Sequence, residues 1–192
     1  MRDQFFAAEG FEGMDALATE VHPGSDGLLF HPYLQGERAP YWDSKLRADF
    51  LGLTIHHGRA HFARALYEGV AYAIRDAMTA AESLGLRYDA LRIIGGGARS
   101  ATWRQIVADV LGRRILVPAN GDASFGAAAL AGIGVGLFDD PADAVARCCR
   151  LVGMHEPSTE NHDRYTHFFG VYSDAQRQLV PINHRLHDLS VE

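Results

Sequence analysis

The chain has 192 residues, of which 47% are hydrophobic and 22% are charged, and its formal net charge at pH 7 is −6. This composition predicts a packed core and argues against an intrinsically disordered chain. The acidic balance argues against a nucleic-acid or anionic-membrane partner, because such surfaces need clustered basic residues. We also expect a cytoplasmic location, because the sequence shows neither a secretory signal nor an apolar stretch of the ~18 residues that cross a bilayer.

The beginning of the sequence predicts short elements joined by turns. Residues 1–27 are rich in Gly, Glu and Asp, and we expect a poorly defined leader whose segment 9–21 holds one short helix. Hydrophobic runs predict strands over 28–34 and 48–54, the first of which begins the main domain. The loop between them contains Pro40, which lacks the amide hydrogen that strand pairing requires.

A long helix is predicted over 57–84, where apolar residues recur at intervals of three and four. This spacing gives one buried stripe, and Gly85 is the expected C-terminal cap. His57 and His61 lie four positions apart, a spacing that can bind a metal ion. Because the sequence offers no third ligand beside them, we expect solvated helix residues and no metal site.

Strands and helices alternate in the second half of the chain. The pattern predicts strands over 90–96 and 113–119 and helices over 101–112, 124–137, 139–152 and 160–179. The order strand–helix–strand indicates a parallel pair with a right-handed crossover, which is typical of an α/β layer. The side chains of the helix over 124–137 are so small that we expect it to pack closely against another element. Residues 181–192 are predicted to be a polar tail, in which His184 and His187 are solvated.

Five further side chains carry individual predictions. Cys148 and Cys149 are adjacent, and a disulfide between neighbouring cysteines is strained, so we expect two small, buried, free thiols on a helix. Trp42 and Trp103 are expected to anchor the core or the packing of helices. For Arg38 two interpretations remain: an exposed surface residue, or a residue that contacts a partner domain or the substrate.

Three consecutive glycines, Gly95, Gly96 and Gly97, lie between a predicted strand and a predicted helix. Glycine loses more conformational freedom on folding than other residues, so the cluster indicates either a tight turn or a ligand close to the backbone. The N-terminus of the following helix offers free amides to an anion, and Ser100 can cap that helix or donate to a ligand. The stretch matches neither the dinucleotide-binding pattern G-x-G-x-x-G nor a P-loop. From these residues alone, both alternatives remain.

Four stretches follow one another in the sequence: QGERAPYWDSKLRADFLGLT, ALYEGVAYAIRDAMTAAESLG, IIGGGARSATWRQIVADVLG and VPANGDASFGAAALAGIGVGLF. Together they resemble the C-terminal domain of the FGGY family of carbohydrate kinases. The glycine block looks most like that of the xylulose kinases. The resemblance implies an α/β, ribonuclease-H-like domain of the actin-like ATPase fold over 28–180, here with an incomplete sheet.

The resemblance also implies a function and a site. Family members bind ATP between two domains and transfer its γ-phosphoryl group to a sugar, here a ketose similar to xylulose. The amides of Gly96 and Gly97 would run along the adenosine and α-phosphate, and Ser100 would reach toward the base. The implied cofactors are ATP and Mg²⁺, and no catalytic or metal-binding residue is implied within this sequence.

Several family elements have no counterpart in this sequence. They are the Asp-x-Gly-Thr phosphate loop, the aspartate general base and the second, glycine-rich phosphate loop. Phosphoryl transfer depends on positioning and charge stabilisation, so we expect the chain alone to be inactive, with the N-terminal kinase domain as its partner. Uncovered strand edges and apolar surface also favour self-association. The alternative is a stand-alone, non-catalytic α/β module for nucleotide binding or interaction.

Overall fold

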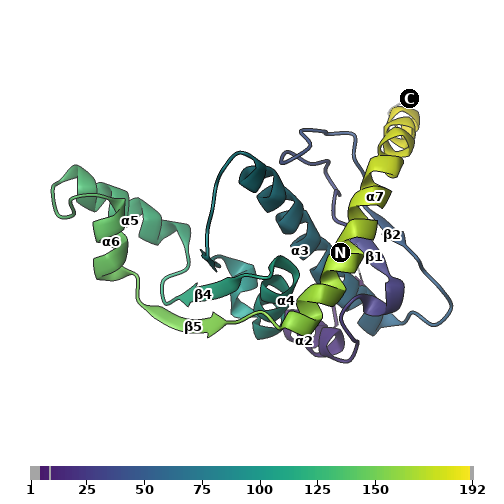
Figure 1. Ribbon diagram of the computed structural model, residues 1–192, viewed down its shortest axis with the longest axis horizontal. Coiled ribbons are helices and arrows are strands. Elements are labelled where there is room, and N and C mark those ends of the chain that lie inside the picture. Colours follow the sequence, from purple (N-terminus) through teal and green to yellow (C-terminus); the bar gives the residue numbers. More distant parts are fainter. Residues whose placement is uncertain (1–4, 9, 191–192) are drawn as a thin grey trace.

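The computed structural model describes residues 5–8 and 10–190 (Figure 1). The α-helices are α2 (Gly10–Thr19), α3 (Arg59–Ser83), α4 (Ala101–Leu111), α5 (Ala123–Gly134), α6 (Pro141–Cys148) and α7 (Thr159–Ser190). The strands are β1 (Leu29–His31), β2 (Asp49–Leu51), β3 (Ala90–Arg92), β4 (Arg114–Pro118) and β5 (Leu151–His155), and the 3₁₀ turns are η1 (Ser25–Gly27) and η2 (Gly96–Arg99). Within the described ranges, every helix is too short or too polar to cross a membrane.

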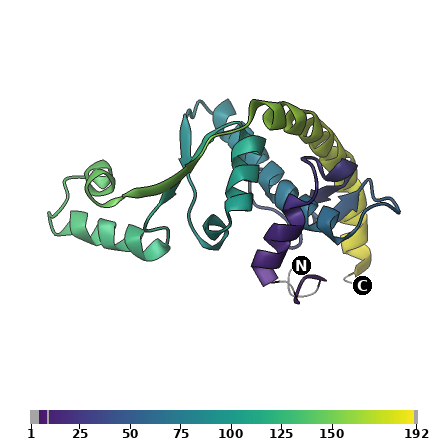
Figure 2. The same cartoon turned by 90° about the horizontal axis from the view of Figure 1, so that it is seen from below.

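The strands form two small sheets. β1 pairs with β2 in an antiparallel hairpin, whereas β3, β4 and β5 form a second sheet with β4 in the centre. β3 and β4 are parallel and are joined through α4, which confirms the predicted α/β layer. Figures 1 and 2 show that α5 and α6 project from this sheet on the side away from α7.

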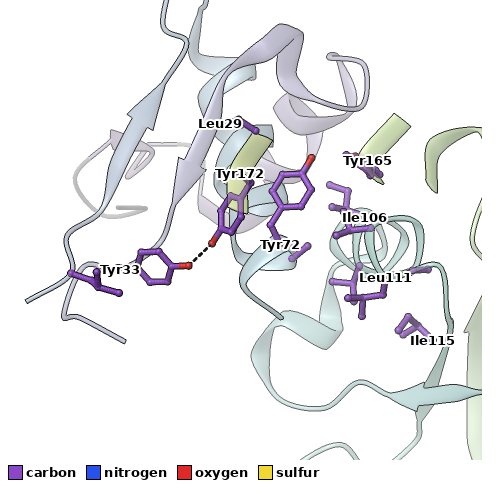
Figure 3. Close-up of a cluster of buried hydrophobic side chains, with 13 residues drawn as sticks. Leu29, Tyr33, Tyr72, Ile106, Leu111, Ile115, Tyr165 and Tyr172 are labelled. Carbon is purple, nitrogen blue, oxygen red and sulfur yellow. Dashed lines mark hydrogen bonds between the residues drawn. The ribbon is translucent and has the colours of Figure 1, made fainter. Parts of the chain in front are cut away.

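The main core lies where α3, α4 and α7 meet. Its largest fully buried side chains are aromatic: Tyr33, Tyr72, Tyr165 and Tyr172. Figure 3 shows Tyr33 and Tyr172 pointing toward each other, and their hydroxyl oxygens lie 2.8 Å apart. Burial raises the pKa of Tyr33 to about 12. Each buried tyrosine combines a large apolar surface with a hydroxyl, and this pair of hydroxyls is satisfied internally.

A buried carboxylate joins three parts of the fold. Glu68 on α3 is 1% exposed, and its Oε1 accepts hydrogen bonds from Gly24 N at 2.9 Å, Tyr165 Oη at 2.8 Å and Arg64 Nε at 2.7 Å. Its Oε2 accepts a hydrogen bond from Ser25 Oγ at 2.8 Å. Four donors on one carboxylate offset part of the cost of removing its charge from water, and burial still raises the pKa of Glu68 above its ordinary value. The network therefore connects α3 and α7 to the turn that precedes β1.

The last helix is longer than the predicted range 160–179, because α7 runs from Thr159 past Pro181 to Ser190. Proline in a helix interior costs about 3 kcal/mol, so contacts beyond it must offset this cost. His184 is partly exposed, as expected, but its Nε2 also lies 2.6 Å from Asp43 Oδ2, a contact that the sequence did not predict. Two further pairs join the same segments: Lys45 with Asp188, and Arg47 with His187. Long-range contacts thus extend the helix beyond the limit that proline suggests.

Several other expectations are corrected. The helix predicted over 139–152 ends at Cys148, because Leu151 begins β5 and pairs with β4. Cys148 is exposed and Cys149 is half-buried, so neither thiol is a core residue. Trp42 is 82% exposed and anchors no core, since it lies at the surface of the loop between β1 and β2.

The small-residue helix α5 packs less closely than its sequence predicts. Gly132 is buried beneath Phe138, whose ring atoms would lie 2.6 Å from a Cβ at this glycine. Elsewhere, large apolar side chains of the α5 region stay exposed among the described residues, including Leu130, Val135 and Leu137. Within the described chain, α5 therefore packs on α6 and on the turn that joins them, and its remaining surface is uncovered.

Candidate functional site

The glycine cluster forms the predicted turn between a strand and a helix. Gly95 has a φ of +86°, a left-handed conformation that favours glycine, and its amide donates to Gly121 O at 2.7 Å. The turn η2 follows, and α4 then begins with Ser100 as its N-cap. Ser100 Oγ accepts a hydrogen bond from Trp103 N at 2.9 Å, which confirms its predicted capping role.

The three glycines serve different needs. Gly95 is required by its backbone conformation, and a Cβ at Gly97 would lie 2.8 Å from Trp103 Nε1. Neither of these reasons explains a glycine at position 96, because a Cβ on Gly96 would meet no atom within 4 Å and its φ is not left-handed. An exposed glycine with open space before it is what close approach of a ligand requires.

Gly96, Gly97 and Ser100 line one pocket of about 600 Å³, within the range of small-molecule sites. Its wall is built from α2, α3 and the η2–α4 junction, and it is mostly apolar. The rings of Tyr67 and Trp103 lie in this wall with their centroids 5.7 Å apart. The structure therefore brings the three predicted residues together on a pocket with aromatic sides.

The wall contributed by α2 was not predicted as part of the site. Asp15 on this helix lines the pocket, and its Oδ1 accepts a hydrogen bond from Tyr67 Oη at 2.6 Å. Burial and the neighbouring Asp15 carboxylate raise the pKa of Tyr67 above its ordinary value. The buried positions Met14 and Ala18 hold α2 against α3, and their spacing was the available sequence signal. The domain start at residue 28 stays a prediction, but α2 belongs to the pocket.

The other sequence-predicted candidates lie outside this pocket. Arg38 is exposed on the loop between β1 and β2. His57 precedes α3, and His61 lies in its first turn, where His61 Nδ1 accepts from Gly58 N at 3.1 Å and Nε2 lies 3.1 Å from Asp26 Oδ2. Among the described residues, no group of three His, Cys, Asp or Glu side chains has a geometry that could hold a metal ion.

Comparison with known families decides the classification. A family model for the FGGY family of carbohydrate kinases, C-terminal domain, matches residues 2–135. The chain belongs to this family. This FGGY-family chain is 36% identical over 179 residues to a xylulose kinase from Staphylococcus epidermidis, covering 93% of this chain and 36% of that protein. It is 34% identical over 190 residues to a gluconokinase from Bacillus subtilis, covering 93% of this chain and 37% of that protein.

The fold agrees with that of a solved family member. The structure of ligand-bound xylulose kinase from Lactobacillus acidophilus matches this FGGY-family chain with a TM-score of 0.85 and 28% identity, covering 93% of this chain and 36% of that one. The chain thus has the actin-like ATPase fold of FGGY kinases, with a small and incomplete sheet, as its sequence predicts. It spans little more than a third of the length of these relatives.

Proposed function

We propose that this chain is the nucleotide-binding, C-terminal part of an ATP-dependent sugar kinase that acts on a ketose similar to xylulose. Gly96 carries the proposal: it faces the pocket beside the N-terminus of α4 and leaves that space open. Xylulose kinases and gluconokinases among the relatives support a sugar substrate, and the similarity to xylulose kinases favours the ketose.

The proposed site combines an apolar slot with donors for an anion. The amides of Gly96 and Gly97 run along the adenosine and the α-phosphate, and the N-terminus of α4 adds its partial positive charge. Ser100 Oγ already accepts a hydrogen bond from Trp103 N, so its hydroxyl hydrogen is available to donate to the base. The pocket thus has room for a nucleoside and polar groups on one side of it.

The remaining parts of the reaction are placed in the rest of the kinase. Magnesium neutralises the phosphates during phosphoryl transfer, and we place its protein ligands, the general base and the phosphate loops in the N-terminal domain. What this chain contributes is binding and orientation of the nucleotide. The uncovered surface of α5 offers apolar area against which the partner domain packs.

Gly96→Val is expected to abolish binding of ADP to the isolated chain. The wild type should bind weakly, with a dissociation constant near the millimolar range, about −4 kcal/mol, because the partner domain supplies much of the phosphate contact. The Cβ of valine would occupy the open space before Gly96, where it would meet no atom within 4 Å. The measurement is an NMR titration with ADP, with chemical-shift changes mapped to residues 95–100.

Gly170→Val is the matched control for this experiment. Gly170 lies on α7, and its Cβ would also meet no atom within 4 Å. This variant should bind ADP like the wild type. Binding that survives Gly96→Val, or shifts that map away from 95–100, would contradict the proposed site and leave the glycines as a turn only.

The isolated chain is expected to show no sugar kinase activity. The phosphate loops and the general base of the family have no counterpart in its sequence, and positioning of both substrates is the main source of catalysis in phosphoryl transfer. A coupled assay of ADP release with xylulose and Mg²⁺–ATP provides the measurement. Turnover above that of a heat-inactivated sample would show this expectation to be wrong.

A further inference from the structure

We infer that Asp15 determines which base the pocket accepts, selecting adenine through its exocyclic amine over bases that carry a carbonyl oxygen at that position. The inference rests on the proposed nucleotide site and assigns a specificity residue within it. Asp15 lies on α2, in the part of the sequence that predicts only a leader, and it is one of the carboxylates that line the pocket.

The shape of the pocket favours a flat ring near Asp15. Tyr67 and Trp103 contribute aromatic surface from α3 and α4, and Val70 adds an aliphatic side chain. The lining is predominantly apolar, which suits the faces of a heteroaromatic base. Such a base must then satisfy its polar edge at the few polar groups of the wall, among them the Asp15 carboxylate.

The orientation of the Asp15 carboxylate is set by Tyr67. Tyr67 Oη donates to Asp15 Oδ1 at 2.6 Å, and the described residues contribute no hydrogen bond to Oδ2. An ionised carboxylate only accepts hydrogen bonds, so Oδ2 favours a donor on the ligand. The amine at C6 of adenine is such a donor. The oxygen at C6 of hypoxanthine is an acceptor, and placing it against the carboxylate would leave both groups unpaired.

The charges around the pocket also favour an orientation in which the base lies near Asp15. Glu12 and Asp15 place negative charge on the wall formed by α2, whereas Arg99 and the amides of η2 belong to a different part of the lining. Phosphate groups are repelled by the first part and attracted by the second. The base is thereby directed toward Asp15 and the phosphates toward the glycine turn.

The test compares ADP with IDP, whose base carries an oxygen in place of the amine at C6 and a hydrogen at N1, where adenine has none. For the wild type we expect ADP to bind about tenfold more tightly than IDP in NMR titrations. Asp15→Asn retains an oxygen that accepts from Tyr67 and gains an amide that can donate to the IDP oxygen. In this variant the ratio of the two dissociation constants should fall to about one.

A control variant separates charge from position. Glu20→Gln removes the same charge at an exposed residue just beyond α2, and it should preserve the wild-type ratio. Equal binding of ADP and IDP by the wild type, or an unchanged ratio in Asp15→Asn, would overturn the role of Asp15 while leaving the nucleotide site in place. If the wild type did not bind ADP, or if Gly96→Val still bound it, the proposed site would be overturned and this inference with it.

Discussion

Glu68→Ala is expected to lower the free energy of unfolding by about 3–5 kcal/mol, the usual cost of removing one partner of a buried ion pair. Arg64, which is 8% exposed in the wild type, would lose its charge partner, and Gly24 N would lose its hydrogen-bond acceptor. Urea unfolding followed by circular dichroism measures the effect. Because the network holds three parts of the fold together, the loss should appear in a single cooperative transition.

Glu82→Ala provides the comparison on the same helix. Glu82 is paired with Arg113 at 3.3 Å, but both side chains are substantially solvent-exposed, so its loss should cost less than about 1 kcal/mol. Equal effects of the two substitutions would contradict the structural role assigned to the Glu68 network.

Gly69→Ala is expected to destabilise the fold by about 3 kcal/mol, near the upper end of the usual range for overpacking. Gly69 lies in the middle of α3, and an added Cβ would be 2.2 Å from Phe30 O and 2.9 Å from Phe30 Cδ1. The first of these atoms belongs to the backbone of β1, which cannot move without disturbing the hairpin. Thermal unfolding should show a clear decrease in the melting temperature.

The opposite sign is expected for Gly170→Ala in α7. This glycine is exposed and meets no atom within 4 Å of its Cβ, so alanine should stabilise the helix by about 0.5–1 kcal/mol. If both alanine substitutions changed stability in the same direction, close packing of α3 on β1 would not be the reason for Gly69.

Much of the fold could be predicted because its signals are local. The apolar spacing over 57–84 is visible in any short window, and the observed α3 differs only at its ends. Ser100 caps α4 and Asp140 caps α6 through amides three positions along the chain. Local structure also explains two of the three glycines: Gly95 has a backbone conformation that favours glycine, and a side chain at Gly97 would meet the neighbouring Trp103.

The site was only partly predictable from the sequence. The glycine block and its resemblance to the family led to Gly96, Gly97 and Ser100, which the fold places on one pocket. The wall formed by α2 was missed, because the hydrogen bond between Asp15 and Tyr67 joins residues 52 positions apart. No pattern within α2 indicates that its carboxylate faces a pocket formed by α3 and α4.

Short-range patterning was thus sufficient for the α/β class, the amphipathic helix α3, the helix caps and the ligand-competent turn, since periodicity and hydrogen bonding within a few residues produce them. Packing over long distances was needed for the rest. Long-range packing extends α7 past Pro181, where His184 pairs with Asp43. It also leaves Trp42 and Cys148 exposed, and it brings α2 to the same pocket as the glycines. These outcomes depend on which distant surfaces meet, and the energy of those contacts exceeds the local preferences that the residues carry.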